Sequence, residues 1–256
     1  MVVWVFAGGG ESEVAGLIPF LEKNFPGCRF KRYTPIRQKL GPKPGKVVSY
    51  GSTGNSLIVQ ITKQLSIALQ NKQNKCDLIL VLDDLDCRDT DTEKYKNMDR
   101  EKILDAIREQ YLAAISKIPE CDNINKLISF AAPELESWII ADWSNTIAKH
   151  PDFRSRHERM RWWLSTKRKI PFDNPESFSE YDKNKNSCRE KLSDALIDST
   201  KFEEDINNEL QPFSKKSHTP DLLREIRPDE VQRKCPLFRE LYNYLHNFCS
   251  SSPGYK

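Results

Sequence analysis

The chain has 256 residues, of which 30% are charged and 38% hydrophobic, with a formal net charge of +3. The mean hydropathy of −0.65 and the lack of a continuous apolar stretch of about 20 residues exclude a membrane-spanning chain, and the first residues lack the basic start of a signal peptide. The seven cysteines are odd in number, scattered and without a CxxC pair. They predict reduced thiols in the cytoplasm rather than a disulfide framework or a zinc site.

Strand and helix patterns alternate over roughly the first 145 residues. Apolar runs predict strands at residues 2–6, 29–33, 78–82 and 126–132, and apolar periodicity predicts helices after residue 11, from about 55 to 69 and from about 99 to 118. Residues 36–54 are rich in glycine and proline and predict a loop. We therefore expect an α/β domain at 1–145, with a mostly parallel sheet flanked by helices, and a mainly helical C-terminal appendage at 146–256.

An acidic cluster follows the strand at 78–82. Because strand side chains alternate, Asp84 and Asp86 fall on one face and can converge on a hard divalent cation such as Mg²⁺, with Asp83 as a neighbour. The alternative is a strand end followed by an acidic, solvated turn.

Carboxylates follow three of the predicted strands, at ends that share one edge of a parallel sheet. Together they predict an oxygen-ligand cage for Mg²⁺ or Mn²⁺, an arrangement suited to phosphoryl transfer. The residues are Glu11 and Glu13, then Asp83, Asp84 and Asp86, and finally Glu134 and Glu136.

Charge is unevenly distributed along the chain. Every charged residue between Lys23 and Cys76 is basic, and acidic residues resume at Asp77. A basic face next to an acidic pocket predicts nucleic-acid binding, and a chance basic surface is the alternative. The residues expected to bind nucleic acid are Lys31, Arg32, Arg37, Lys39, Lys43 and Lys46.

A second basic cluster, between Arg154 and Lys169, surrounds Trp162 and Trp163. These tryptophans either stack on a base or anchor the appendage, and both interpretations stay open.

The glycine turn at residues 8–10 lacks the spacing of a dinucleotide-binding or P-loop motif. The glycine turn with Glu11, the Asp84-Leu85-Asp86 motif, the segment 132–142 and the segment 213–218 together resemble the Toprim fold of topoisomerases, primases and OLD-type nucleases. A bacterial Toprim-like family linked to phage defence is more similar still. The resemblance spans nearly the whole chain, although each motif is short. It implies a Mg²⁺- or Mn²⁺-dependent nuclease, the effector of a prokaryotic antiviral defence system, with nucleic acid and an ATPase or other defence-complex protein as partners and no membrane.

The resemblance also implies roles for single residues. Glu11 is expected to be catalytic and a metal ligand, and Lys215 and His218 to assist catalysis by stabilising charge and moving protons. The metal ligands carried over are Asp84, Asp86 and Glu136.

One position departs from the Toprim-like pattern. The residue before the glycine turn is usually glutamate, and here it is Ala7. Three explanations stay open: Glu11 or Glu13 takes over its role, the chain is a catalytically silent nucleic-acid-binding or scaffolding subunit, or a catalytic glutamate has been replaced in this sequence. A phosphatase with Asp84 as nucleophile is a third hypothesis, although its motif normally lies on the first strand.

Overall fold

The computed structural model describes residues 1–36, 38–39, 47–48, 51–71 and 73–251. The side chains of residues 11–13, 38–39 and 47–48 lie outside this description.

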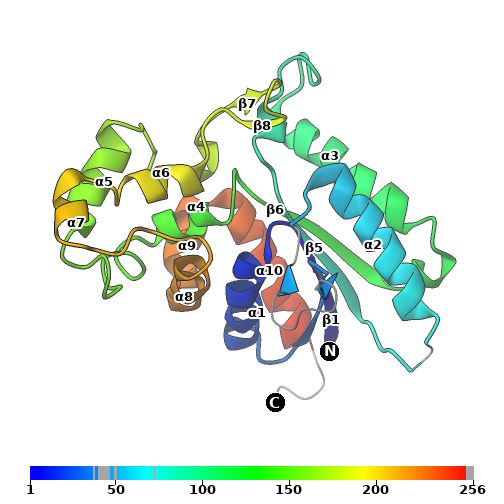
Figure 1. Cartoon of the computed structure of the whole chain (residues 1–256). Helices are drawn as coiled ribbons and strands as arrows, with labels where there is room; N and C mark the ends of the chain where they lie inside the picture. Colours follow the sequence, from blue (N-terminus) through cyan, green and yellow to red (C-terminus); the bar gives the residue numbers. More distant parts are fainter. Residues whose placement is uncertain (37, 40–46, 49–50, 72, 252–256) are drawn as a thin grey trace.

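The centre of the fold is a four-stranded, fully parallel sheet in the order β2-β1-β5-β6 (Figure 1). The α/β prediction is confirmed. The chain moves from β1 outward to β2, crosses back to β5 beside β1, and then continues outward to β6. The reversal between β1 and β5 creates a crevice at the carboxyl ends of these strands, where α/β sheets place their ligands. The strands are β1 (Val2–Ala7), β2 (Arg29–Thr34), β5 (Leu78–Asp84) and β6 (Asn125–Ala131).

Helices cover both faces of this sheet. Helices α1 (Glu11–Asn24) and α10 (Pro236–Ser250) lie on one face, and α2 (Gly54–Leu69) and α3 (Arg100–Ile115) lie on the other (Figure 1). The strands are buried on both sides, which explains their continuous apolar runs. Alternate residues divide between two cores: Leu80 and Leu82 pack with α1 and α10, and Ile79 and Val81 pack with α2 and α3.

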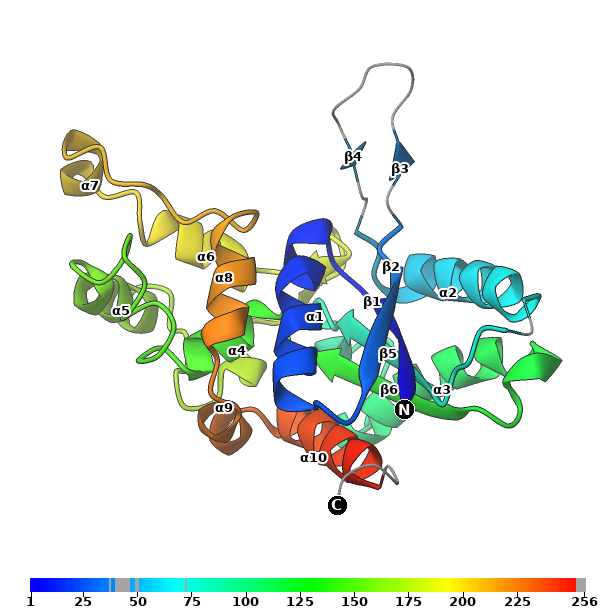
Figure 2. The same cartoon turned by 90° about the horizontal axis from the view of Figure 1, so that it is seen from below.

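The remaining elements are short. Figure 2 shows the small ribbon of β3 and β4 standing off from the sheet. The helices are α4 (Glu136–Ala141), α5 (His157–Thr166), α6 (Leu192–Asp198), α7 (Glu203–Asn207), α8 (His218–Glu225) and α9 (Pro228–Lys234), with 3-10 turns at Arg88–Thr90, Pro119–Cys121 and Pro175–Ser177. The ribbons are β3 (Gln38–Lys39) with β4 (Val47–Val48), and β7 (Tyr181–Asp182) with β8 (Ser187–Cys188).

The C-terminal helices complete the core of the N-terminal part. Helix α10 packs on β6, and α8 packs on α1. A Cβ atom at Gly16 would lie 2.7 Å from the Cα atom of Pro220, so this close crossing of α1 and α8 requires glycine. The stretches 1–145 and 146–256 therefore share one hydrophobic cluster.

Two disulfides join distant parts of the chain. Cys28 is bonded to Cys249, and Cys87 to Cys188. The expectation of reduced thiols is wrong for these four cysteines, because the partners of each pair are 221 and 101 residues apart and only the fold brings them together. The first bond ties the end of α10 to the turn before β2.

Glu176 anchors the start of α10. Its two carboxylate oxygens accept the backbone N–H groups of Leu237 (3.0 Å) and Phe238 (3.2 Å), which have no partner within the helix. Burial raises the pKa of Glu176 to about 7, although these N–H groups and Arg100 oppose the shift and Glu240 adds to it.

None of the helices in the described part of the chain is long and apolar enough to span a membrane.

We predict that three thiols react in the unfolded, unreduced protein. Cys76, Cys121 and Cys235 are unpaired, and the other four cysteines are in disulfides. Titration with a thiol-reactive chromophore in denaturant, with and without prior reduction, measures the difference. Seven reactive thiols before reduction would contradict the two bonds.

We predict that Glu176→Gln flattens part of the pH dependence of stability. A carboxyl whose pKa is raised on folding contributes stability that is complete below its unfolded pKa and is lost as the pH rises through the folded value. The wild type should therefore lose up to about 3 kcal/mol relative to Glu176→Gln between about pH 4.5 and pH 8. Urea unfolding at pH 5 and pH 8 tests this, with the exposed Glu101→Gln as control. If the free energies of unfolding of variant and wild type differ by the same amount at both pH values, the raised pKa of Glu176 is contradicted.

Candidate functional site

The first strand leaves the sheet through a glycine that touches β5. The Gly8 N–H donates to the Leu82 carbonyl (2.7 Å), and a Cβ atom at Gly8 would lie 2.3 Å from Oδ1 of Asp83. Gly9 has a φ of +70°, a conformation that favours glycine. The glycines thus let β1 end directly beside the acidic end of β5.

Asp83 ties the end of β5 to the helices of one face. Its Oδ2 accepts hydrogen bonds from the Gly54 N–H (2.9 Å), Arg88 (2.5 Å) and the Tyr111 hydroxyl (2.5 Å). Burial raises the pKa of Asp83, and Arg88 counteracts this. Because this oxygen already accepts three hydrogen bonds from within the protein, we assign Asp83 a structural role.

The side chain of Asp84 lies on the opposite face of β5, beside the residue that precedes α4. Its side chain is nearly buried, and its Oδ1 accepts the backbone N–H of Leu135 (3.2 Å). Ala7 pairs with Leu82, two residues before Asp84, so Ala7 and Asp84 face the same way. The end of β1 thus presents a buried methyl group on the face of the sheet that carries Asp84.

Glu136, at the start of α4, is fully buried. Its Oε1 accepts the hydroxyl of Thr219 (3.1 Å), and Lys215 Nζ lies 3.5 Å from Oε2. Lys215 lies in the segment before α8, and Thr219 is the second residue of α8. The fold thus brings the predicted residues Lys215 and Glu136 into contact. Thr219 was not expected, and no local sequence pattern marks it.

Asp86 does not follow the strand alternation that predicted its direction. Strand β5 ends at Asp84, and Asp86 has a left-handed φ of 47°. Its carboxylate lies 3.7 Å from Lys191 Nζ, which also lies 3.8 Å from Glu134. Glu134 in turn accepts the Ser193 N–H (3.0 Å). Lys191 lies at the start of α6 and was missed because its polar stretch carries no motif.

A polar cavity of about 230 Å³ lies beside Asp86. It is bounded by the first residues of α2, by Arg88 and Lys94, and by Tyr181 of the β7–β8 ribbon. The Cys87–Cys188 disulfide joins that ribbon to the residue after Asp86. Cationic side chains and the first residues of α2 therefore border the acidic end of β5.

The donor atoms at this edge fit a hard divalent cation in type, since they are carboxylate oxygens held in a mostly buried setting. Among the described side chains, however, no three of these carboxylates have ligand atoms within 4.8 Å of one another. Glu11 is the first residue of α1, and its side chain lies outside the described set. Among the described side chains, those that would hold a metal are Asp84 and Glu136, with Asp86 at the border.

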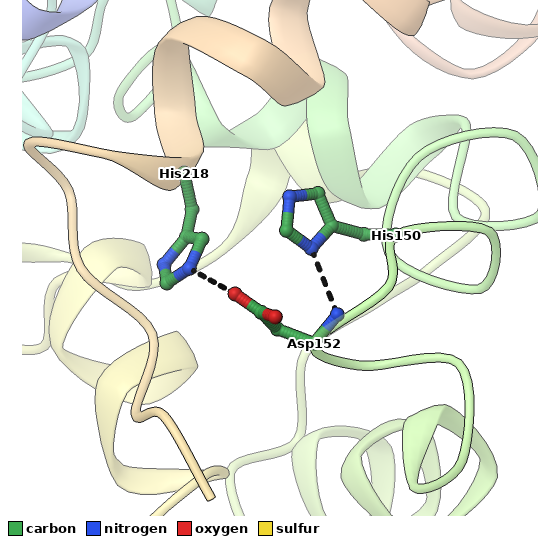
Figure 3. A group of neighbouring side chains, drawn as sticks. All are labelled: His150, Asp152 and His218. Atoms are coloured by element: carbon green, nitrogen blue, oxygen red, sulfur yellow. Dashed lines mark hydrogen bonds and ion pairs between the residues drawn. The ribbon is translucent and has the colours of Figure 1, made fainter.

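His218 lies in a different cluster, with His150 and Asp152 (Figure 3). Its Nδ1 accepts the Ser214 N–H (2.7 Å), so in the neutral ring the proton is on Nε2, which lies 3.1 Å from Asp152 Oδ2. His150 Nδ1 likewise accepts the Asp152 N–H (3.3 Å). Burial lowers the pKa of His150, and His218 adds to the shift.

In this arrangement both nitrogens of His218 are engaged, and neither offers a lone pair to a metal or a substrate. The Ser214 contact closes the turn that carries Lys215, which favours a positioning role for His218.

The basic run before Cys76 is only partly described. Lys31 is exposed on β2 and lies over the rings of Trp4 and Tyr33, whereas Arg32 on the other face donates to the Pro35 carbonyl (2.7 Å). Arg37, Lys43 and Lys46 lie outside the described residues, as does the side chain of Lys39 in β3.

Comparison with known families gave one match. A family model with the description Domain of unknown function (DUF4276) matches residues 10–246. No curated protein and no solved structure matches the chain.

Proposed function

The chain belongs to the family described as Domain of unknown function (DUF4276), and for this chain we propose metal-dependent hydrolysis of phosphodiester bonds in nucleic acid. The observation that carries the proposal is the pair of nearly buried carboxylates, Asp84 and Glu136, at the ends of two adjacent parallel strands. Asp84 ends β5, next to the reversal of the strand order, and Glu136 follows the neighbouring strand β6. A lysine from a distant segment, Lys215, reaches Glu136. Buried carboxylates are costly unless a cation balances them.

A divalent ion held by Asp84 and Glu136 would supply Lewis-acid stabilisation of a phosphoryl oxygen and a hydroxide nucleophile. Lys215 balances Glu136 in this structure, and its ammonium group is placed to stabilise negative charge on a phosphate that approaches the same edge. Lys191 lies between Asp86 and Glu134, where it balances these two carboxylates and can stabilise a phosphate in the same way. Asp83 and His218 hold the elements that carry these groups.

The substrate class follows from the cations around the edge. Lys94 and Arg88 border the cavity beside Asp86, and Lys31 is exposed on the outer strand. Such groups favour a polyanion, with binding that weakens as salt rises. The Toprim-like resemblance supports a role as the effector of a prokaryotic antiviral defence system, with an ATPase or another defence-complex protein as a partner.

Ala7 favours a second candidate function, a catalytically silent nucleic-acid-binding subunit. Ala7 is 2% exposed and belongs to the apolar cluster shared with α1. The site therefore lacks a carboxylate at the end of β1, and Glu11 would have to replace it from α1.

We predict that Asp84→Asn and Glu136→Gln each lower the rate of cleavage about a hundredfold or more, because a lost metal ligand removes several kcal/mol of charge stabilisation. Cleavage of labelled DNA and RNA in Mg²⁺ or Mn²⁺ measures the rate, and a chelator should abolish it. The control is Glu120→Gln, an exposed carboxylate at the opposite edge of the sheet. Unchanged rates in both variants, with melting temperatures near that of the wild type, would contradict the assignment.

We predict that Ala7→Glu raises the cleavage rate at least about tenfold, because it adds a carboxylate beside Asp84 that can move protons. The new charge is buried, so the variant should also be less stable by a few kcal/mol. Ala7→Gln has nearly the same size without the charge and serves as control. If wild type and Ala7→Glu both bind nucleic acid without cutting it under saturating Mn²⁺, the silent-subunit function is the correct one.

A further inference from the structure

Two adjacent tryptophans on α5 have opposite environments. Trp163 is partly buried against the main core and meets the ring of Phe202 edge-on, with centroids 6.0 Å apart. Trp162 is 55% exposed, and the Nζ atom of Lys167 lies 5.7 Å from its ring centroid. Trp163 is thus the anchor, which leaves Trp162 as an aromatic surface facing solvent with a cation beside it.

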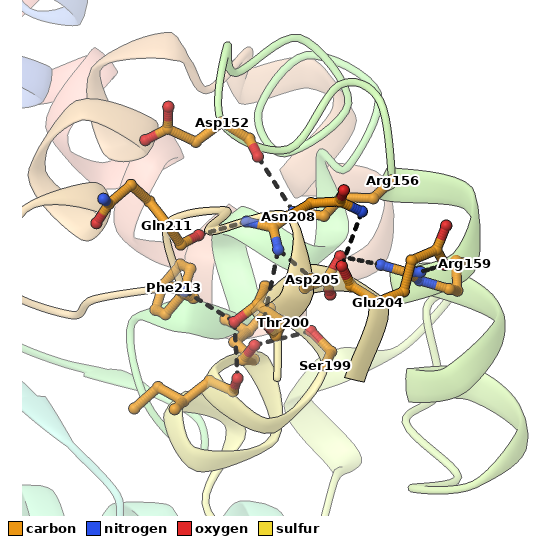
Figure 4. A network of polar contacts seen from close by, with 12 residues as sticks. Asp152, Arg156, Arg159, Ser199, Thr200, Glu204, Asp205, Asn208, Gln211 and Phe213 are labelled. Carbon is orange, nitrogen blue, oxygen red and sulfur yellow. Dashed lines mark hydrogen bonds and ion pairs between the residues drawn. The ribbon is translucent and has the colours of Figure 1, made fainter. Parts of the chain in front are cut away.

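The arginines and lysines of this region divide into two groups. Arg156 and Arg159 are bound to Asp205, with further contacts to Glu204 and to backbone carbonyls, and they fasten α7 to α5 (Figure 4). The other group is close to Trp162 in the sequence, is exposed, and makes no ion pair with any described residue, although the Arg161 guanidinium lies 5.0 Å from the ring centroid of Phe172. Its members are Arg161, Lys167 and Lys169.

The two groups imply different functions for similar residues. A cationic side chain that stabilises the fold is paired with a carboxylate of the protein, as Arg156 is with Asp205. Arg161, Lys167 and Lys169 keep their charge available to an outside anion. The exposed carboxylate of Glu158 lies one helical turn before Trp162 and is the exception on this surface.

This surface is connected to the carboxylate edge through α6. Lys191, which contacts Asp86 and Glu134, comes directly before α6. Arg168, just after α5, pairs with Glu190 and with Asp198 at the two ends of α6. This helix of 7 residues is about 10 Å long. Helix α6 contacts α5 and begins next to Lys191, so it connects the two regions.

We infer that Trp162, with Arg161, Lys167 and Lys169, binds single-stranded nucleic acid by stacking a base on the indole and pairing the cations with phosphates. Single-stranded nucleic acid is the occupant that needs both features, because its unpaired bases have accessible π-faces and its backbone carries the charge. A duplex offers only phosphates to the same surface. Whether the bound strand is then cleaved rests on the proposed function, whereas the binding itself does not depend on it.

The test is equilibrium binding of the full chain to a labelled single-stranded oligonucleotide, as DNA and as RNA, followed by fluorescence anisotropy. A chelator is present, so that hydrolysis does not occur. Trp162→Ala should weaken binding about 5- to 150-fold, which corresponds to about 1–3 kcal/mol for one stacked base. Trp162→Phe should keep most of the affinity, and Glu158→Gln should increase it.

The matched control is Ile67→Ala, since Ile67 is an apolar side chain of similar exposure (54%) on α2, on the other face of the sheet. It should leave binding unchanged. A duplex of the same sequence should bind more weakly and should not respond to Trp162→Ala.

Equal affinity of wild type and Trp162→Ala for the single strand would overturn the inference. So would a dimer that Trp162→Ala dissociates while oligonucleotide binding is unchanged, since Trp162 would then be a protein contact. If the wild type binds through Trp162 but never cleaves in Mg²⁺ or Mn²⁺, the proposed hydrolysis fails and the binding surface remains.

Discussion

The reversal of strand order between β1 and β5 determines where chemistry is possible in this protein. All four strands are parallel, so their carboxyl ends share one edge, and the chain leaves β1 and β5 in opposite directions. In α/β sheets the position between two such strand ends is where ligands bind. The glycines after β1, the acidic end of β5 and the start of α4 after β6 therefore meet around it.

Placing carboxylates at such an edge requires cations from elsewhere in the chain. Asp83 is balanced locally by Arg88, whereas Glu136 contacts Lys215, which lies in the segment before α8. Helices α8 and α10 also close the hydrophobic core with α1 and β6. The C-terminal part therefore contributes both to the core and to the site, and the Lys215 contact would be missing from a chain that ends near residue 145.

The sequence predicts what depends on local patterns. The four strands of the sheet, helices α1, α2 and α3, and the direction of Asp84 follow from apolar runs and alternation. Asp86 is the counterexample, because alternation ends with the strand and a left-handed residue sets its direction. The Lys191 contacts and both disulfides depend on residues far apart in the sequence, so no local pattern reveals them. The resemblance to Toprim-like proteins pointed to Lys215, which only the structure places beside Glu136.

Among the described residues, side chains of the types that bind metals gather in two places. One is the strand ends with Asp84 and Glu136, and the other is the group of His150, Asp152 and His218. The strand ends provide carboxylate oxygens suited to Mg²⁺ or Mn²⁺, whereas His150 and His218 have their Nδ1 atoms bound to backbone N–H groups. The most direct test is calorimetric titration of Mn²⁺ into the wild type, Asp84→Asn, Glu136→Gln and His150→Ala without nucleic acid. We predict a saturable site that the two carboxylate variants lose and His150→Ala keeps. Loss of Mn²⁺ binding only in His150→Ala would contradict a metal site at the strand ends.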